Sequence, residues 1–393
     1  MTFEWTQCLA DISREDWQAC FGAGRVTASY ELQQALERSE VVADFHYLKV
    51  LRNGQVAGII ACFCMDCSLT DLAPVTIQSL VQRARRIHDR LFKVRLFVQG
   101  SPLATCSDML GLPGVRQGQW DDLLETLHEQ IQDRAATLGI GFVCLKEFDQ
   151  GLDQRLFPRI GQHYLICRSP DTTYIYVAKV NGLSYIDNML SKYRNVLKKR
   201  RKAFSDAGLH WVVEENFSHH AADMHRLYLN VLERSNTRFE RLTEAFFREI
   251  CSCLGAQAYA LMCFDGERLV AFELFLKGDS LHPLYLGIDY AYRDAGSLYF
   301  NCLYRILEEA ENSGAAYIEL GQTSYEAKFS IGAVSSPLYF YISHRSGWVN
   351  RLLRLLRESL FPAPRIPALR GVFKYRTEYL QALKSQGLID HVD

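Results

Sequence analysis

The chain has 393 residues, of which 48% are hydrophobic and 12% aromatic, and its 44 Lys and Arg nearly balance its 45 Asp and Glu. This composition excludes a disordered or fibrous protein, and the balanced charge excludes a general attraction to nucleic acid. The length exceeds the usual span of one hydrophobic core, so we expect two domains.

The N-terminus and the hydropathy pattern predict a cytoplasmic protein. No basic stretch leads into an apolar one after Met1, and no window approaches 18 uninterrupted apolar residues, so we expect neither an export signal nor a membrane span. The 12 cysteines lie mostly in apolar, strand-like runs and are expected to be reduced and buried. The spacing of Cys62, Cys64 and Cys67 is not that of a structural zinc site, so we expect no metal.

The predicted elements follow one order twice along the chain: a hairpin, a strand, a loop, a helix ending at glycine and a final strand. In the first half these are 45–50, 56–61, 94–100, 123–135 and 141–146, with an extra helix at 77–91. In the second half they are 258–263, 269–276, 283–287, 298–310 and 316–321. A chance alignment of common elements is the alternative to a true repeat.

Helices at 183–204, 221–234 and 242–254 connect the two halves, and a helix at 347–359 stops at a proline-rich segment. The pattern predicts a mixed α/β fold, in which each half is a mostly antiparallel twisted sheet flanked by helices. The predicted divisions are an N-terminal half, bridging helices that include a basic one, a C-terminal half with the active cleft, and a tail: 1–180, 181–255, 256–360 and 361–393.

The loop at 289–298 runs from a strand into a helix and carries Arg293, Gly296 and Ser297 beside the helix start. Backbone N–H groups at a helix N-terminus hold phosphate and carbonyl oxygens well. An ordinary glycine turn is the alternative. The loop resembles the Arg/Gln-x-x-Gly-x-Gly/Ala pyrophosphate loop of the GNAT acyltransferase superfamily, which binds coenzyme A, although Leu298 stands where a small residue is expected.

The resemblance extends over about 40–345 and includes the segments 193–202 and 320–333. The element order is similar to that of the GNAT branch related to the Fem aminoacyl-tRNA-dependent peptidyltransferases, which pair two GNAT-like halves. This implies tandem GNAT-like halves and an acyltransferase that moves an acyl group from acyl coenzyme A to an amine of a small molecule or peptide. The resemblance also implies that Arg293, Gly296 and Ser297 bind the donor.

An amine must lose a proton before or during acyl transfer, so the site needs a base. Glu273 interrupts an apolar strand and Asp289 follows the next strand, which makes them the preferred candidates, with Glu319 a third. His282 and Tyr285 are weaker candidates of the same kind, and Tyr285 is also the candidate proton donor to the leaving thiolate. A structural role is the alternative for each of these residues.

Two groups of residues are candidates for binding substrate. Gln322, Tyr325 and Lys328 follow a buried strand and should converge at its carboxyl end, where Lys328 would contact a carboxylate or phosphate unless it is an ordinary surface lysine. The segment 192–202 carries seven basic residues, among them Lys198, Lys199 and Arg201.

That basic helix suits the phosphates of coenzyme A, the backbone of tRNA or an acidic lipid surface, and a merely solvated helix face is the alternative. Two further functions therefore stay open beside acyl transfer from coenzyme A. One is an aminoacyl-tRNA-dependent transferase of the Fem type. The other is a non-catalytic binding module that keeps the GNAT fold.

Overall fold

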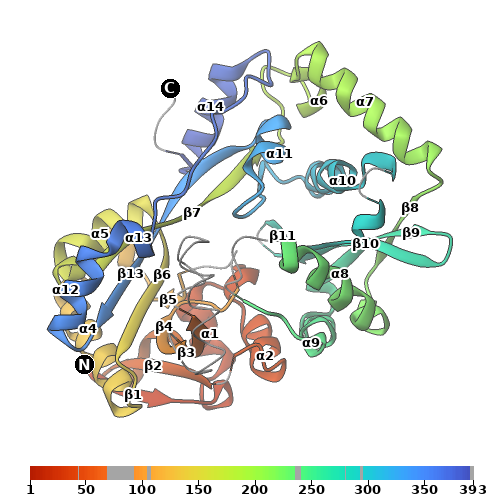
Figure 1. Ribbon diagram of the computed structural model, residues 1–393. Coiled ribbons are helices and arrows are strands. Elements are labelled where there is room, and N and C mark those ends of the chain that lie inside the picture. The colour runs from red at the N-terminus through yellow and green to blue at the C-terminus, as the bar shows by residue number, and fades with distance from the viewer. Residues whose placement is uncertain are drawn as a thin grey trace, which may run out of the picture. The chain divides into compact units, whose positions relative to one another are not determined.

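The computed structural model describes residues 1–42, 44–68, 93–103, 108–234, 240–278, 280–292 and 295–389. The chain forms two compact units. Unit 1 consists of Met1–Pro170, Thr237–Glu240 and Pro337–Pro364, and unit 2 consists of Asp171–Asn236, Arg241–Ser336 and Arg365–Asp393. Both are mixed α/β with mostly antiparallel strand pairing, as predicted (Figure 1). The helix predicted at 77–91 lies outside the described residues.

The sheet of unit 1 begins with the predicted hairpin. β2 (Asp44–Arg52) pairs antiparallel with β3 (Gln55–Ser68) across Asn53 and Gly54, whose φ angles of 53° and 79° are those of a tight hairpin turn. The strand order is β1-β2-β3-β4-β6-β13, in which only β4 and β6 are parallel. The other strands are β1 (Thr2–Thr6), β4 (Lys93–Gln99), β5 (Leu110–Gly111), β6 (Phe142–Asp149) and β13 (Val334–His344).

Helices bury their apolar sides against this sheet. They are α1 (Arg14–Phe21), α2 (Tyr30–Arg38), α4 (Leu124–Thr137), α5 (Gln150–Ile160), α12 (Gly347–Leu355) and α13 (Arg357–Leu360). The predicted helix at 123–135 is α4, and it is followed at Gly139 by a left-handed residue with a φ of 70°. The predictions for this half are therefore confirmed wherever the residues are described.

Unit 2 contains a four-stranded antiparallel sheet in the order β11-β10-β9-β8. Its strands are β8 (His210–Glu214), β9 (Ala258–Asp265), β10 (Arg268–Lys277) and β11 (Leu281–Ile288). A second pairing joins β12 (Tyr317–Glu319) to the last residues of β7 (Leu165–Tyr176). The helices are α6 (Tyr185–Asn188), α7 (Ser191–Asp206), α8 (Ala221–Arg234), α9 (Glu244–Leu254), α10 (Leu298–Ser313), α11 (Tyr325–Ser330) and α14 (Arg376–Ser385).

The prediction of one continuous helix at 183–204 is wrong, because the helix breaks at Met189 and Leu190. Both residues are extended, with ψ angles of 144° and 146°. Met189 forms a bridge with Phe373, and the Leu190 N–H donates to the carbonyl of Val372 at 2.9 Å. A backbone pairing with a segment far along the chain therefore overrides the local helix propensity.

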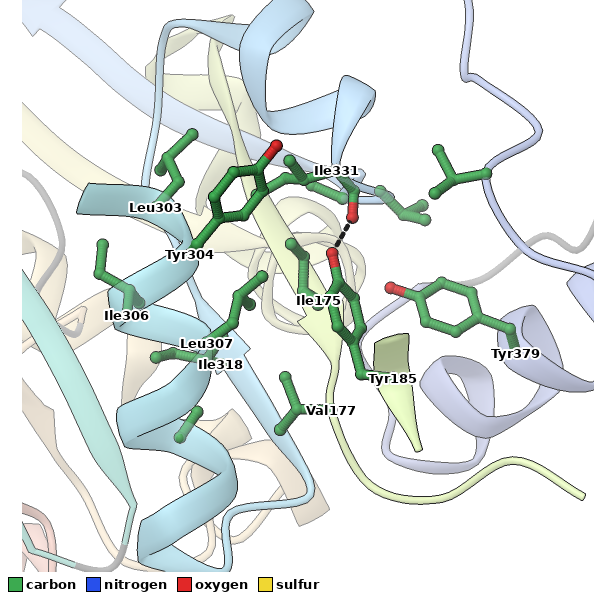
Figure 2. Close-up of a cluster of buried hydrophobic side chains, with 14 of the residues drawn as sticks. Ile175, Val177, Tyr185, Leu303, Tyr304, Ile306, Leu307, Ile318, Ile331 and Tyr379 are labelled. Atoms are coloured by element: carbon green, nitrogen blue, oxygen red, sulfur yellow. Dashed lines mark hydrogen bonds between the residues drawn. The ribbon is translucent and has the colours of Figure 1, made fainter. Parts of the chain in front are cut away.

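The core of unit 2 fixes the elements that carry the candidate site. Figure 2 shows Leu307 of α10 beside Ile318 of β12, and Tyr185 donating its hydroxyl proton to the carbonyl of Ile331. Since Ile331 directly follows α11, this cluster holds β12, α10 and α11 together. Among the described helices, none is both long and apolar enough to cross a membrane.

Candidate active site

A buried lysine lies at the centre of the candidate site. Lys328 of α11 is 5% exposed, and its Nζ donates to the carbonyl oxygens of Leu320, Gly321 and Gln322 at 2.7, 2.9 and 2.7 Å. An ammonium group has three donors, so all three are engaged within the protein. The structure thus gives Lys328 a different role from the predicted substrate contact: it binds the loop that follows β12.

The loop after β12 adopts an uncommon backbone conformation that makes these contacts possible. Gly321, Thr323 and Ser324 have φ angles of 67°, 64° and 52°, although left-handed backbone is rare for residues other than glycine. The hydroxyl of Thr173 donates to the carbonyl of Gly321 at 2.7 Å and helps to hold it. The turn thereby aims three successive carbonyl groups at one ammonium.

One buried and one partly buried carboxylate interact with Lys328. Glu273 of β10 is 1% exposed, and burial raises the pKa of its carboxyl well above 4.5, while Lys328 acts in the opposite direction. Burial also raises the pKa of Glu319, which the hydroxyl of Thr172 and the charge of Lys328 partly oppose. Burial in turn lowers the pKa of Lys328 to about 7, against the influence of Glu319 and Glu273.

Two polar atoms of this cluster lack a hydrogen-bond partner among the described residues. They are Oε1 of Glu273 and Nε2 of Gln322, both buried. Buried polar groups are nearly always paired, so each of these two atoms is one that can take a water molecule or a ligand group. Gln322 was predicted to bind substrate, and its side chain remains suited to that role.

Tyr299, in the first turn of α10, joins the same cluster. Its hydroxyl hydrogen-bonds with Ser324 and interacts electrostatically with Glu273, and burial raises its pKa to about 12. Sequence reasoning did not select Tyr299 or Thr172, because a helical aromatic residue and a strand threonine carry no motif.

Asp289 is engaged in structural contacts rather than poised as a base. Its Oδ2 accepts from Arg268 at 2.6 Å, and its Oδ1 accepts from the backbone N–H of Ala291 at 3.0 Å. A carboxylate that closes a turn and pairs with a guanidinium is poorly placed to accept a substrate proton. Of the two preferred carboxylates, the structure therefore favours Glu273.

Tyr285 lies on the other side of the sheet from Glu273. In the β10–β11 pair it stands opposite Leu274, the neighbour of Glu273, and alternate side chains of a strand point to opposite faces. Its ring packs edge-on against Tyr228 of α8 and Phe246 of α9, at 5.7 and 5.8 Å. Tyr285 therefore does not share a site with Glu273. The structure does not bring the candidate proton donor, Tyr285, together with the candidate base, Glu273.

The predicted donor loop is only partly described. Arg293 lies outside the described residues. Gly296 has a φ of 66° and packs so closely on α7 that an added Cβ would lie 3.1 Å from the Cα of Phe204. Ser297 is also left-handed and precedes α10 without a side-chain cap. The glycine is therefore required by a turn and by helix packing, whatever else the loop binds.

The remaining candidates for substrate binding differ in whether their side chains already bond to other residues of the protein. Lys198 and Lys199 are exposed on α7 and make no hydrogen bond or ion pair with any described residue, whereas Arg201 is paired with Glu308. The hydroxyl of Tyr325 donates to the carbonyl of Asp171 at 2.9 Å and supports the loop. Two of the three predicted α7 cations thus remain available for an anion.

Comparison with known proteins bears on the fold of the chain. Residues 191–328 match a family described as "Acetyltransferase (GNAT) domain". Among solved structures, the crystal structure of FemX is similar, with a TM-score of 0.55 at 10% identity, covering 89% of this chain and 99% of that chain.

Two weaker similarities have a TM-score of 0.49 at 11% identity. One is to the C-terminal domain of a putative lysylphosphatidylglycerol synthetase from Agrobacterium fabrum, covering 90% of this chain and 99% of that chain. The other is to a tandem GNAT protein from the clavulanic acid biosynthesis pathway, covering 88% and 99%. No curated protein matches. The predicted resemblance to GNAT proteins of the Fem-related branch is confirmed at the level of the fold.

Proposed function

We propose that this chain, which carries a GNAT acetyltransferase domain at residues 191–328 and has the fold of FemX, is an N-acyltransferase. In this proposal it transfers an acyl group from acyl coenzyme A to an amine of a small molecule or peptide. One observation carries the proposal: a buried glutamate, Glu273, lies inside the GNAT domain with an unpaired oxygen.

The chemistry needs a base that is active near neutral pH. The amine nitrogen attacks the thioester carbonyl, a C–N bond forms, the C–S bond breaks, and the nitrogen proton must leave. Glu273 suits this role because burial raises its pKa well above 4.5, and its Oε1 has no partner among the described residues to compete for the proton. The proton would pass to Glu273 directly or through water, and the departing thiolate would be protonated from solvent.

Lys328 and Gln322 would then have supporting roles. Lys328 holds the β12 loop and places a positive charge near Glu273, which keeps the carboxylate form accessible despite burial. The amide of Gln322 would donate a hydrogen bond to the acceptor or to the acyl carbonyl. Arg293, Gly296 and Ser297 would hold the pyrophosphate of the donor at the uncapped start of α10.

Calorimetric binding of coenzyme A, with acetyl and longer acyl forms beside it, tests the donor. We expect micromolar binding that Arg293→Ala weakens about tenfold, the loss of one charged phosphate contact. Arg226→Ala is the matched control, because Arg226 is a half-exposed arginine on α8 of the same unit that pairs with Asp223. Absence of binding by every form would contradict the coenzyme A donor.

Glu273→Gln tests the base separately from the donor. The amide keeps the shape of the side chain but cannot accept the proton, so turnover should fall about a hundredfold or more while donor binding stays unchanged. Glu326→Gln, an exposed position on α11, is the control and should leave turnover intact. Normal turnover by the Glu273 variant would assign the proton transfer to another group.

Aminoacyl transfer from charged tRNA is the second candidate, because Lys198 and Lys199 are exposed and have no partner among the described residues. Under this hypothesis, Lys198→Gln with Lys199→Gln should weaken tRNA binding and reduce its salt dependence. Lys202→Gln is the control, since Lys202 is already paired with Asp206 at 2.7 Å. Ligand binding without turnover by any donor would instead indicate a non-catalytic module.

A further inference from the structure

The helix pair α12–α13 of unit 1 exposes an unusual amount of apolar surface. Trp348 is 72% exposed and Leu355 is 83% exposed, and Leu352 and Leu356 are each 40% exposed. The spacings from 348 to 352, 355 and 356 place these four side chains on one side of the helix. Four large apolar residues in a single strip exceed the scattered exposure that is normal on a protein surface.

The other side of the same helix explains why it is folded and rigid. Leu353 is 4% exposed and packs with Cys167, Ile342 and Phe361, and Val349 contacts this cluster. Asn350 fixes the start of the helix, because its side chain accepts from the backbone N–H of His344 at 2.7 Å and donates to the His344 carbonyl at 2.6 Å. The apolar strip is therefore presented by a helix that is already anchored to unit 1.

Positive charge borders the strip. Arg345, Arg351, Arg354 and Arg357 lie in or beside α12–α13, whereas Glu358 is the one acidic residue between positions 345 and 360. All four arginines are exposed, and none forms an ion pair with a described residue. In a chain with a net charge of −1, this is a local excess of positive charge beside exposed tryptophan and leucine.

We propose that α12–α13 docks unit 1 onto an anionic phospholipid bilayer. Trp and Leu on one side and Arg beside them are the composition of a helix that lies in the interface plane, where the apolar side chains enter the acyl boundary and the cations meet phosphates. The helix α12 has nine residues and is about 14 Å long, so it can lie on a bilayer but cannot span it. The four arginines, which form no ion pair with a described residue, are complementary to the phosphates of such a bilayer.

This proposal is independent of the acyl transfer chemistry, because it uses only residues of unit 1, and the candidate active site belongs to unit 2. It also differs from the acidic lipid surface considered for the α7 cations, since α7 carries no comparable exposed tryptophan and leucine. Vesicle binding that requires Lys198 and Lys199 rather than α12 would contradict it.

Flotation of the full chain with vesicles tests the proposal. We expect binding to phosphatidylcholine vesicles that contain about 30% phosphatidylglycerol, weak binding to pure phosphatidylcholine, and weakening by salt. Trp348→Ser with Leu355→Ser should lower the partition coefficient about a hundredfold, because each exposed side chain contributes roughly tenfold when it enters the apolar layer. Val213→Ser, at a valine that is 52% exposed on β8, is the control and should leave binding unchanged.

A charge variant separates the two parts of the surface. Arg351→Gln with Arg354→Gln should weaken binding about fivefold per arginine at low salt and change it little at high salt. Failure of the wild-type chain to bind anionic vesicles would overturn the proposal. So would sedimentation that shows a dimer abolished by Trp348→Ser, because a second copy of the chain would then be the occupant of the strip.

Discussion

Lys328 illustrates how one buried side chain holds a loop of the candidate site in place. Its three bonds to the carbonyls of Leu320, Gly321 and Gln322 compensate for the loss of hydration of its charge, and Glu273 and Glu319 supply opposite charge. Removing the ammonium would leave three carbonyl groups, the buried carboxyl of Glu273 and the partly buried carboxyl of Glu319 without their cation. Lys328 is thus a structural support for the region in which we place the chemistry.

We expect Lys328→Met to lower the free energy of unfolding by about 3 to 5 kcal/mol, the cost of breaking a buried charge cluster from one side. Urea unfolding followed by circular dichroism measures the change. Lys199→Met is the control, because an exposed substitution should alter stability by less than about 0.5 kcal/mol. A near-neutral Lys328→Met variant would show that the carbonyl contacts are weak and that the lysine is available to a ligand.

Two buried histidines of unit 1 predict a pH dependence of stability. Burial lowers the pKa of His46 to about 4, and burial and His163 lower that of His128 to about 4. Between pH 6.5 and pH 4 the unfolded chain binds protons that the native imidazoles do not, so stability falls as the pH falls through this range. Each histidine should contribute about 3 kcal/mol of this loss.

His128→Gln isolates one of these contributions. His128 lies 2.8 Å from the hydroxyl of Tyr164, and glutamine can occupy the site without titrating. The unfolding free energy of the variant should depend less steeply on pH than that of the wild type between pH 6.5 and pH 4, as urea unfolding at several pH values will show. His210→Gln, at an exposed position, should keep the wild-type slope, and an unchanged slope in His128→Gln would mean that His128 titrates normally.

Sequence reasoning identified Glu273 correctly as an unusual residue, because a carboxylate within the apolar run of β10 must be buried at a cost. The contacts of Asp289, a candidate base, and the position of Tyr285, a candidate proton donor, could not be predicted in the same way. The pairing of Asp289 with Arg268 depends on contact between positions 21 apart in the sequence. The position of Tyr285 on the opposite sheet face depends on the register of the β10–β11 pair, which the local pattern does not determine.

At the scale of elements, α7 is joined to α10 by the ion pair of Arg201 with Glu308, by Arg200, which donates to the hydroxyl of Tyr304 at 3.0 Å, and by the buried amide of Asn301. The Nδ2 of Asn301 donates to the carbonyls of Gly296 at 2.7 Å and Arg200 at 3.1 Å, and Asn301 is 5% exposed. The guanidinium of Arg200 also lies 3.3 Å from the centre of the Phe300 ring. These contacts hold the basic helix against the first turn of α10, where the donor loop ends.

Asn301→Ala should therefore destabilise the protein by about 2 kcal/mol, because it removes the hydrogen bonds from Nδ2 to the buried carbonyl of Gly296 and to the carbonyl of Arg200. Urea unfolding measures this cost, and Asn195→Ala on the exposed side of α7 is the control. The same variant should speed amide hydrogen exchange at the C-terminal end of α7 more than elsewhere. Uniform protection in the variant would mean that the other contacts between the two helices, such as the ion pair of Arg201 with Glu308, are sufficient to hold them together.

The elements that the sequence predicted well are those with local signals. A few neighbouring residues are enough to predict a hairpin with an Asn-Gly or Asp-Gly turn, or a helix that ends at glycine. The break at Met189 does not, because it depends on pairing with Phe373. β13 was not predicted either, since Ser335, Ser336 and Pro337 interrupt the alternation that marks a strand and its pairing with β6 is distant in sequence.

At the scale of the whole molecule, each compact unit is assembled from separate stretches of chain. β7 begins in unit 1 and ends in unit 2, and β13 begins in unit 2 and ends in unit 1. The predicted domain boundaries at 180, 255 and 360 were drawn from the apparent repeat in the sequence. They stay a prediction. The compact units are defined instead by which strands pair, and such pairing is not visible in a linear pattern.

This organisation predicts how the chain tolerates cutting. A chain truncated after residue 180 should not form a cooperative unit, because β6 loses its partner β13 and the sheet loses α12 and α13. Residues 1–170 joined by a flexible Gly/Ser linker to residues 337–364 should unfold cooperatively in urea. Cooperative unfolding of the truncated chain would show that β13 is dispensable, and failure of the fusion to fold would show that unit 1 depends on unit 2.

The late position of β13 also has a consequence for synthesis on the ribosome. The edge of β6 that β13 covers is translated early, but its partner strand emerges only after nearly all of unit 2 has been made. During that interval the nascent chain carries an unprotected sheet edge, which neighbouring chains can pair with. We expect yield of the folded protein to rise when translation is slowed or when a chaperone covers nascent chains, and aggregation to begin in unit 1.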